Sequence, residues 1–146
     1  MNPLLRTVAG VLAGLGVLML LVVGVELISN VAHPFPDDFQ GTHEEVCRHV
    51  ERFPAWVLGV AVPAWGAAAL AGTWTARSLG NVAAAAIVGL LTFTALAFNV
   101  AMLPYPVWFK AAALVAIPAA IYAGGVRPGG VAVMAAAART TPTQPE

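Results

Sequence analysis

The residues best suited to chemistry in this sequence are His43 and Cys47, four positions apart in the stretch HEEVC. On a helix this spacing places both side chains on one face. Both can bind zinc, and with Glu44 between them the stretch comes close to H-E-x-x-H, in which the glutamate is the base of a zinc protease. Zinc takes three or four protein ligands, but His49 would lie on another face and His33 could join only through folding. The sequence therefore offers His43 and Cys47 as candidate metal ligands without requiring a metal.

The same stretch can also be interpreted without a metal. Glu44 and Arg48, and likewise Glu45 and His49, stand at the spacing where opposite charges pair along a helix. The stretch would then be a solvated helix at the membrane interface. All three histidines and five of the seven acids fall between residues 33 and 51, because this segment lies in the longest part of the chain outside the predicted membrane spans.

Glu26 is the second candidate, because it stands at the end of a long apolar run. An ionisable side chain at membrane depth costs free energy, so it marks a functional site by default. Asn99, Lys110 and His33 are expected at the same depth and are its candidate partners. Such a group could carry protons or bind a cation. The alternative, which we favour from the sequence, is that it only hydrogen-bonds to Asn99 or pairs with Lys110 and holds the helices in position.

The stretch PYPVWFK, residues 104–110, is the third candidate. Tyr105, Pro106 and Trp108 could line the mouth of a pocket. Tyrosine and tryptophan also settle at the level of the lipid headgroups. The stretch would then be an interface anchor with no further role, and we favour this interpretation.

Four apolar segments must position these residues. Each is about as long as a helix that crosses roughly 30 Å of hydrocarbon. No period-two alternation suggests a membrane barrel, and a helix satisfies its own backbone amides in lipid. The sequence therefore predicts an all-α, integral membrane four-helix bundle, with helices at about residues 7–30, 55–76, 82–103 and 108–126.

The segment between the first two spans, residues 31–54, is predicted to be an outer loop with its own short amphipathic helix. The prolines of HPFP end the first span. Thr42 and Glu45 have the spacing of a capping box, so a helix should run from about residue 43 to 53. Its apolar face would hold Val46, Val50 and Phe53, lying on the bundle or the membrane surface.

Composition supports a membrane location and excludes several classes of protein. The chain of 146 residues is 60% hydrophobic and 10% charged, against about 25% charged in soluble domains. The formal net charge is zero and there is no basic run, so nucleic acid is not an expected partner. One cysteine excludes an intrachain disulfide and multi-cysteine metal sites, and no cofactor is expected.

Charge distribution also suggests an orientation. With four spans both termini lie on one side, and that side carries one basic residue more than the other. The positive-inside rule then favours cytoplasmic termini. Residues 1–130 form the expected membrane domain, and residues 131–146 are predicted to be a short apolar stretch and a disordered tail. The basic residues on the predicted inner side are Arg6, Arg77, Arg127 and Arg139, and those on the outer side are Arg48, Arg52 and Lys110.

Small residues recur at spacing four in the predicted spans, as Gly10 and Gly14, Ala68 and Gly72, and Ala116, Ala120 and Gly124. Such residues let helix backbones approach closely in lipid. The lipid bilayer is therefore one expected partner, and a second copy or a larger membrane protein is another.

Glu26 stands late in the first span and is followed by the segments HPFPDDF, AGTWTARSLG and, at the end of the third span, FNVAMLPYPVWF. In these features the chain resembles a group of small, uncharacterised bacterial four-helix membrane proteins. The resemblance covers about residues 6–127. It implies the fold and highlights Glu26, Asn99, Pro104, Pro106 and Trp108, but it implies no activity and does not extend to His43 or Cys47.

Three functions remain open from the sequence. We favour a non-enzymatic packing or accessory subunit of the membrane. The alternative is a small-solute or proton-linked transporter or channel that uses Glu26. A membrane metalloenzyme built on His43, Glu44 and Cys47 is the third.

Overall fold

The computed structural model describes residues 2–126, and this part of the chain is all-helical, as predicted. Its five helices are α1 (Pro3–Ala32), α2 (His43–Glu51), α3 (Ala55–Leu79), α4 (Val82–Met102) and α5 (Val107–Gly125). All but α2 are long and apolar enough to cross a membrane. The apolar stretch and tail predicted for residues 131–146 lie outside the described residues.

The ends of α1 and α2 follow from local chemistry. The Asn2 side chain accepts a hydrogen bond from the Leu4 N–H at 3.0 Å, and Pro3 begins the helix, where its missing N–H costs nothing. At the other end, Pro34 disfavours helical geometry at His33, whose φ and ψ are −144° and 79°. The predicted capping box of α2 is present. This helix ends at Glu51, two residues earlier than predicted, because Pro54 restricts the residue before it.

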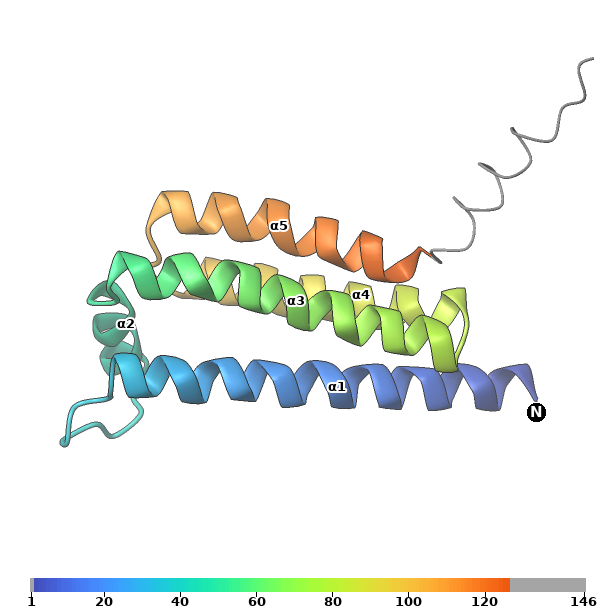
Figure 1. The fold of residues 1–146 in the computed structure, drawn as a ribbon. Coiled ribbons are helices and arrows are strands. Elements are labelled where there is room, and N and C mark those ends of the chain that lie inside the picture. Colours follow the sequence, from blue (N-terminus) through green and yellow to red (C-terminus); the bar gives the residue numbers. More distant parts are fainter. Residues whose placement is uncertain (1, 127–146) are drawn as a thin grey trace, which may run out of the picture.

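The long helices pack around α3, which contacts α1, α4 and α5. The helix α4 also contacts α1 and α5, whereas α1 and α5 do not approach each other. All four run lengthwise side by side, with α2 across one end and the N-terminus at the other (Figure 1). We call these ends the α2 end and the N-terminal end.

Close packing at the N-terminal end depends on small residues. A Cβ added at Gly10 would lie 2.6 Å from Gly80 Cα, and one at Gly14 would lie 2.7 Å from the Gly72 carbonyl oxygen. Neither position can hold a side chain unless a backbone moves. Ala84 and Val88 of α4 are fully buried, and Val11 of α1 packs against them. This half of the bundle is therefore tightly closed.

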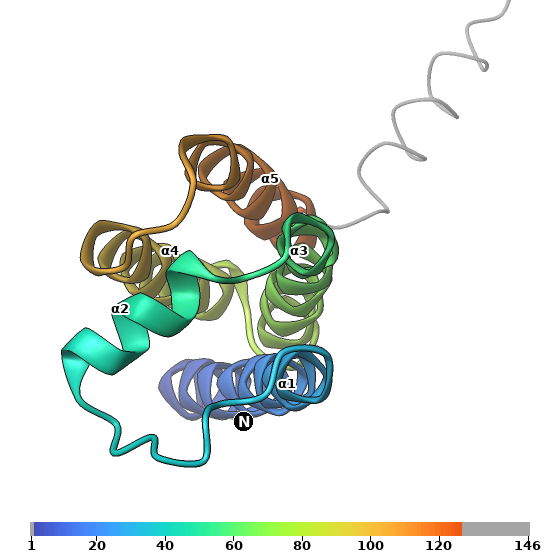
Figure 2. The same ribbon diagram turned by 90° about the vertical axis from the view of Figure 1, so that its left-hand side faces the viewer.

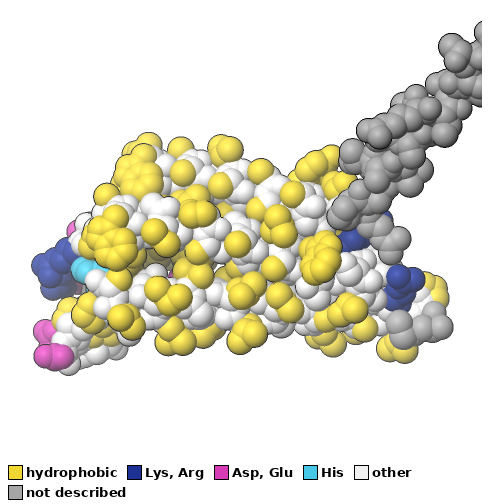
Figure 3. Space-filling view, viewed as in Figure 1, with side chains coloured by type: hydrophobic (Ala, Val, Ile, Leu, Met, Phe, Trp, Pro, Cys, Tyr) yellow, Lys and Arg dark blue, Asp and Glu magenta, His cyan; other side chains and the backbone are white. Residues whose placement is uncertain are grey.

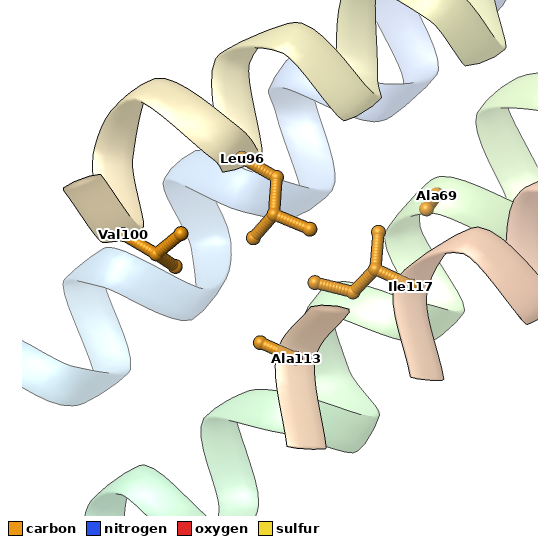
Figure 4. Close-up of a cluster of buried hydrophobic side chains, with 5 residues drawn as sticks. All are labelled: Ala69, Leu96, Val100, Ala113 and Ile117. Carbon is orange, nitrogen blue, oxygen red and sulfur yellow. The ribbon is translucent and has the colours of Figure 1, made fainter. Parts of the chain in front are cut away.

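Nearer the α2 end, α1 and α4 separate. In the view onto the α2 end, the near end of α1 lies below α3, and α1 runs toward α4 as it recedes from the viewer (Figure 2). The short helix α2 lies in front of the space between α1 and α4. The core here comes from the other three long helices: α3, α4 and α5 bring Ala69, Leu96, Val100, Ala113 and Ile117 together (Figure 4).

The outer surface is that of a membrane protein. Apolar side chains cover the flank of the bundle, and charged side chains gather at its two ends (Figure 3). On α1 alone, Leu12, Leu20 and Leu27 are each more than 60% exposed. In water such a surface would aggregate, whereas lipid tails solvate it. The fold therefore fits a multi-pass membrane protein.

Candidate functional site

Glu26 lies where α1 has separated from α4, and it borders a cavity of about 180 Å³. Trp65 of α3 and Asn99 of α4 line the same cavity. The cavity is open at its side rather than enclosed, and Glu26 accordingly retains exposed surface. Apart from Glu26, Trp65, Asn99 and the Thr92 hydroxyl, its lining is apolar: Leu18, Met19, Val22, Ala95, Leu96 and Ile117.

A second cavity of about 190 Å³ lies between Glu26 and the short helix α2. Glu26, Trp65 and Asn99 line this cavity as well. They therefore stand at the junction between a crevice that opens along the flank of the bundle and a chamber beneath α2. The other residues of the chamber are Ser29, Phe35, Val46, His49, Val50, Phe53, Val57, Leu58, Ala61, Leu103 and Tyr105.

The three polar groups at this junction lack partners among residues 2–126. Trp65 Nε1 and Asn99 Oδ1 are buried and make no hydrogen bond. The Trp65 indole lies within interaction range of the Glu26 carboxylate, but its N–H does not meet hydrogen-bond geometry there. Glu26 makes no ion pair in the described chain, and neither cavity has a lysine or arginine in its lining. Buried polar groups are normally paired, and two unpaired ones, Trp65 Nε1 and Asn99 Oδ1, lie here beside the exposed and unpaired carboxylate of Glu26. Because the three residues share both cavities, they indicate a site that is prepared for a ligand.

Of the partners predicted for Glu26, Asn99 shares both cavities with it. Lys110 lies in the first turn of α5 and lines neither cavity. His33 also lines neither cavity and instead borders the loop beyond the end of α1. The fold thus brings Glu26 and Asn99 together and leaves Lys110 and His33 elsewhere.

An aromatic cluster covers the chamber at the α2 end. The His33 and His49 rings are stacked with centroids 4.4 Å apart, and Phe35 stacks on His49 at 4.2 Å. The Phe53 ring meets His49 edge-on at 5.2 Å. Burial lowers the pKa of His49, and the nearby His33 lowers it further. A neutral His49 therefore suits this cluster, which forms a cap over the Glu26 site.

The buried face of α2 differs in part from the predicted one. Val50 is buried as expected, but the other buried residue is His49, and Val46 and Phe53 are half-buried. Pairing of Glu45 with His49 was also predicted. Glu45 instead accepts hydrogen bonds from the backbone N–H groups of Thr42 and Gln40. His49 is free to turn inward because capping already satisfies the glutamate.

A third cavity, of about 520 Å³, lies between the 33–39 loop and α2. Its lining mixes the aromatic cluster with charges of both signs: Asp37, Asp38, Glu45, Arg48 and Arg52. Arg48 forms the predicted ion pair with Glu44 at 3.1 Å. With both signs present and one arginine already paired, this cavity indicates no particular ligand.

The PYPVWFK stretch contributes one residue to the site. Tyr105 lines the chamber beneath α2, and its ring lies 4.6 Å from that of Phe109. Burial raises the pKa of Tyr105 to about 12, and the negative charge of Glu26 adds to the effect, so the phenol is a neutral hydrogen-bonding group. Pro106 caps α5, and Trp108 is 46% exposed. These two residues lie on the outside, as an interface anchor would.

The candidate metal pair lies apart from the Glu26 site. His43 Nε2 and Cys47 Sγ are 3.5 Å apart on α2. Residues 2–126 contain no group of three or more histidine, cysteine or acidic side chains placed to hold a metal ion. The helix α2 therefore brings His43 and Cys47 together, and no third candidate ligand joins them within residues 2–126.

Trp65, Thr92 and Phe35 line these cavities without having been among the candidate site residues of the sequence. One signal was present for Trp65, because an indole N–H in an uncharged span needs a partner. Nothing in the sequence indicated that α1 and α4 separate at this depth.

No family model, curated protein or solved structure matches this chain. The functional argument therefore depends on the geometry of the site.

Proposed function

We propose that this chain is a membrane-embedded binding protein whose site is the junction formed by Glu26, Trp65 and Asn99. The observation that carries the proposal is that these three polar groups share two cavities and have no partners among the described residues. A purely structural carboxylate would be paired, because an unpaired one costs free energy in an apolar setting. Binding at Glu26 is also the first step of the transport function considered from the sequence.

The two halves of the bundle favour access from the α2 end or from the flank. Both cavities lie in the half nearer α2, whereas Ala76, Ala84 and Val88 fill the N-terminal half with no exposed surface. A ligand at Glu26 would therefore have no open path to the N-terminal end. Transport would require that half to open, whereas binding alone would not.

We further propose that the α2 end faces outward and that both termini are cytoplasmic. Among described residues away from the α2 end, the only charged groups beyond Glu26 are Arg6 and Arg77, whereas all the remaining acids lie around α2. The positive-inside rule counts Lys and Arg rather than acids, and the described residues place three of them, Arg48, Arg52 and Lys110, at the α2 end against two at the other. The proposed orientation therefore depends on the full sequence, in which the expected inner side carries four basic residues and the outer side three. Arg127 and Arg139, which contributed to the same expectation, lie outside the described residues.

The test is whether Glu26 is accessible from the lipid phase. The protein in lipid nanodiscs is treated with dicyclohexylcarbodiimide, a lipid-soluble reagent that modifies carboxyl groups in apolar surroundings, and the modified peptide is identified by mass spectrometry. We expect modification at Glu26 and little at Glu51, which is exposed to water on α2. Filling the crevice with Ala95→Trp should protect Glu26. An unmodified Glu26 in the native protein would contradict the proposal.

Stability distinguishes the same proposal from a locking role for Glu26. Because no partner is lost and an unpaired charge is removed, Glu26→Gln should leave the free energy of unfolding unchanged or raise it. A loss of about 3–5 kcal/mol, which is typical of breaking a buried ion pair, would instead mean that Glu26 holds the helices together.

A packing or accessory subunit is the second candidate, and the exposed face of α1 favours it. Four of its leucines, Leu4, Leu12, Leu20 and Leu27, are more than 60% exposed, and the helix contacts only α3 and α4. Cross-linking in native membranes through a cysteine introduced at Leu20, in a Cys47→Ser background, tests this role. A discrete cross-linked species would support it, whereas uncross-linked monomer would leave lipid as the neighbour of α1.

A further inference from the structure

We propose that the ligand of the Glu26 site is a lipophilic ammonium, with its charged head at the junction of the two cavities and its hydrocarbon tail in the crevice between α1 and α4. This inference rests on the proposed binding function and specifies its ligand class. It is carried by the charge, the shape and the hydrogen-bonding groups of the site.

Charge is the first step of the argument. Glu26 is the only acidic residue that lines the two cavities, and no lysine or arginine accompanies it. The remaining titratable side chains in these two linings are Tyr105 and His49. Burial within the cap lowers the pKa of His49. A cation in the cavity would supply the missing counter-charge, whereas an anion would be repelled by the carboxylate.

Shape is the second step. The crevice is open at its side and has an apolar lining beyond its polar junction, with Met19 and Val22 on α1 and Ala95 on α4. Each cavity, at about 180 and 190 Å³, is smaller than the roughly 300–1,000 Å³ typical of sites for drug-sized ligands. The crevice therefore suits a head group and the first part of a chain, while the rest of the tail extends into the bilayer.

Hydrogen bonding and aromatic contact favour an ammonium with N–H groups. The Glu26 carboxylate accepts hydrogen bonds, and the Asn99 amide can present its oxygen to the cavity by rotation of the side chain. The faces of Trp65 and Tyr105, which also line the chamber, attract cations. A neutral alcohol of the same length would fill the crevice but would leave the carboxylate without a counter-charge.

The test compares three probes of equal chain length: dodecylammonium, dodecanol and dodecanoate. Each is titrated at pH 7 into the full-length protein in phosphatidylcholine nanodiscs, and the heat from protein-free nanodiscs is subtracted. We expect saturable binding of dodecylammonium at one site, with dodecanol about tenfold or more weaker, as expected for a lost buried charge pair. Dodecanoate should not bind.

Variants locate the binding. Glu26→Gln should weaken dodecylammonium about tenfold or more and leave dodecanol unchanged, whereas the matched surface variant Glu51→Gln should leave both unchanged. Ala95→Trp should prevent binding of both probes by filling the crevice, and it keeps the test decisive if Glu26→Gln does not fold.

The outcomes separate this inference from the function on which it rests. If dodecanol binds as tightly as dodecylammonium, or if Glu26→Gln has no effect on dodecylammonium, the ammonium assignment is wrong. If the ammonium assignment is wrong but Ala95→Trp still blocks binding of the probes, the site and the proposed binding function remain. If no probe binds saturably, the ammonium inference is overturned, and carbodiimide modification of Glu26 then decides separately whether an accessible site exists.

Discussion

At the scale of the residue, two asparagines show the difference between a structural polar group and a functional one. Asn81 begins α4: its side chain accepts a hydrogen bond from the Ala84 N–H at 3.0 Å and donates one to Thr7 Oγ1 at 2.7 Å. Asn99, on the same helix, leaves its buried Oδ1 without a partner. The first amide joins α1 to α4, and the second contributes nothing comparable to the fold.

This contrast predicts opposite effects of the same substitution. Asn81→Leu should destabilise the protein by about 1–2 kcal/mol, the usual cost of losing a helix cap. Asn99→Leu should leave stability unchanged or raise it, because an unsatisfied buried group is removed. Reversible unfolding in mixed micelles measures both. A larger loss for Asn99→Leu than for Asn81→Leu would show that Asn99 is a structural residue.

His49 gives the cap a pH dependence whose sign can be worked out. Because its pKa is lowered in the folded protein by burial and by His33, the unfolded chain takes up a proton first as the pH falls. The stabilising contribution of neutral His49 is therefore complete above the ordinary histidine pKa of about 6.5 and is lost as the pH falls below it. The pKa of Glu45 is lowered by the Thr42 N–H, so its contribution is lost only in the more acidic glutamate range.

Amide hydrogen exchange in α2 tests this prediction. Between pH 7 and 5, protection of α2, corrected for the intrinsic pH dependence of exchange, should fall in the wild type. It should fall less in His49→Phe, which keeps a ring against Phe35 but cannot take up a proton. Equal losses in both proteins would mean that His49 does not control the cap.

At the scale of the element, the contact between α1 and the end of α3 determines where the bundle closes. A Cβ at Gly10 would meet backbone atoms at Gly80 and Ala76, whereas one at Gly16, on the same helix, would meet nothing within 4 Å. Closure at the N-terminal end follows from this backbone approach. The separation of α1 from α4 nearer α2 is what creates the crevice.

Gly10→Ala and Gly16→Ala therefore form a matched pair. Gly10→Ala should destabilise the protein by about 1–3 kcal/mol, the usual range for overpacking. Gly16→Ala should be neutral or stabilise by up to about 1 kcal/mol, because alanine has the higher helix propensity. Unfolding of both variants in the same lipid mixture gives the comparison, and equal stability would argue against close α1–α3 packing at Gly10.

At the scale of the whole molecule, the two ends of the bundle differ in charge and in access to the site. The α2 end carries most of the described charges, the aromatic cap and the chamber. Of the charges on residues 2–126, the N-terminal end carries only Arg6 and Arg77, and small residues close this end. The proposed orientation therefore also states from which side of the membrane the site is reached.

Cys47, the only cysteine of the chain, is a natural reporter of this orientation. In sealed right-side-out vesicles a membrane-impermeant maleimide should label it from outside, because α2 lies at the proposed outer end. In a Cys47→Ser background, Ser78→Cys at the other end of α3 should be labelled only after the vesicles are made permeable. The reverse pattern would invert the topology.

The sequence by itself determined the number and kind of spanning helices, because a run of apolar residues long enough to cross a bilayer has few other stable conformations. It also determined the capping box of α2, which depends only on residues three positions apart, and it indicated Glu26 because a charge in an apolar run is conspicuous. Only the tertiary structure decided which groups meet Glu26. Asn99 shares its cavities and Lys110 does not, because helix neighbours depend on packing between segments far apart in the chain. Trp65 became part of the site for the same reason: α1 packs on α4 at the N-terminal end, where Val11 and Leu15 lie against Ala84 and Val88, and the crevice forms where the two helices separate.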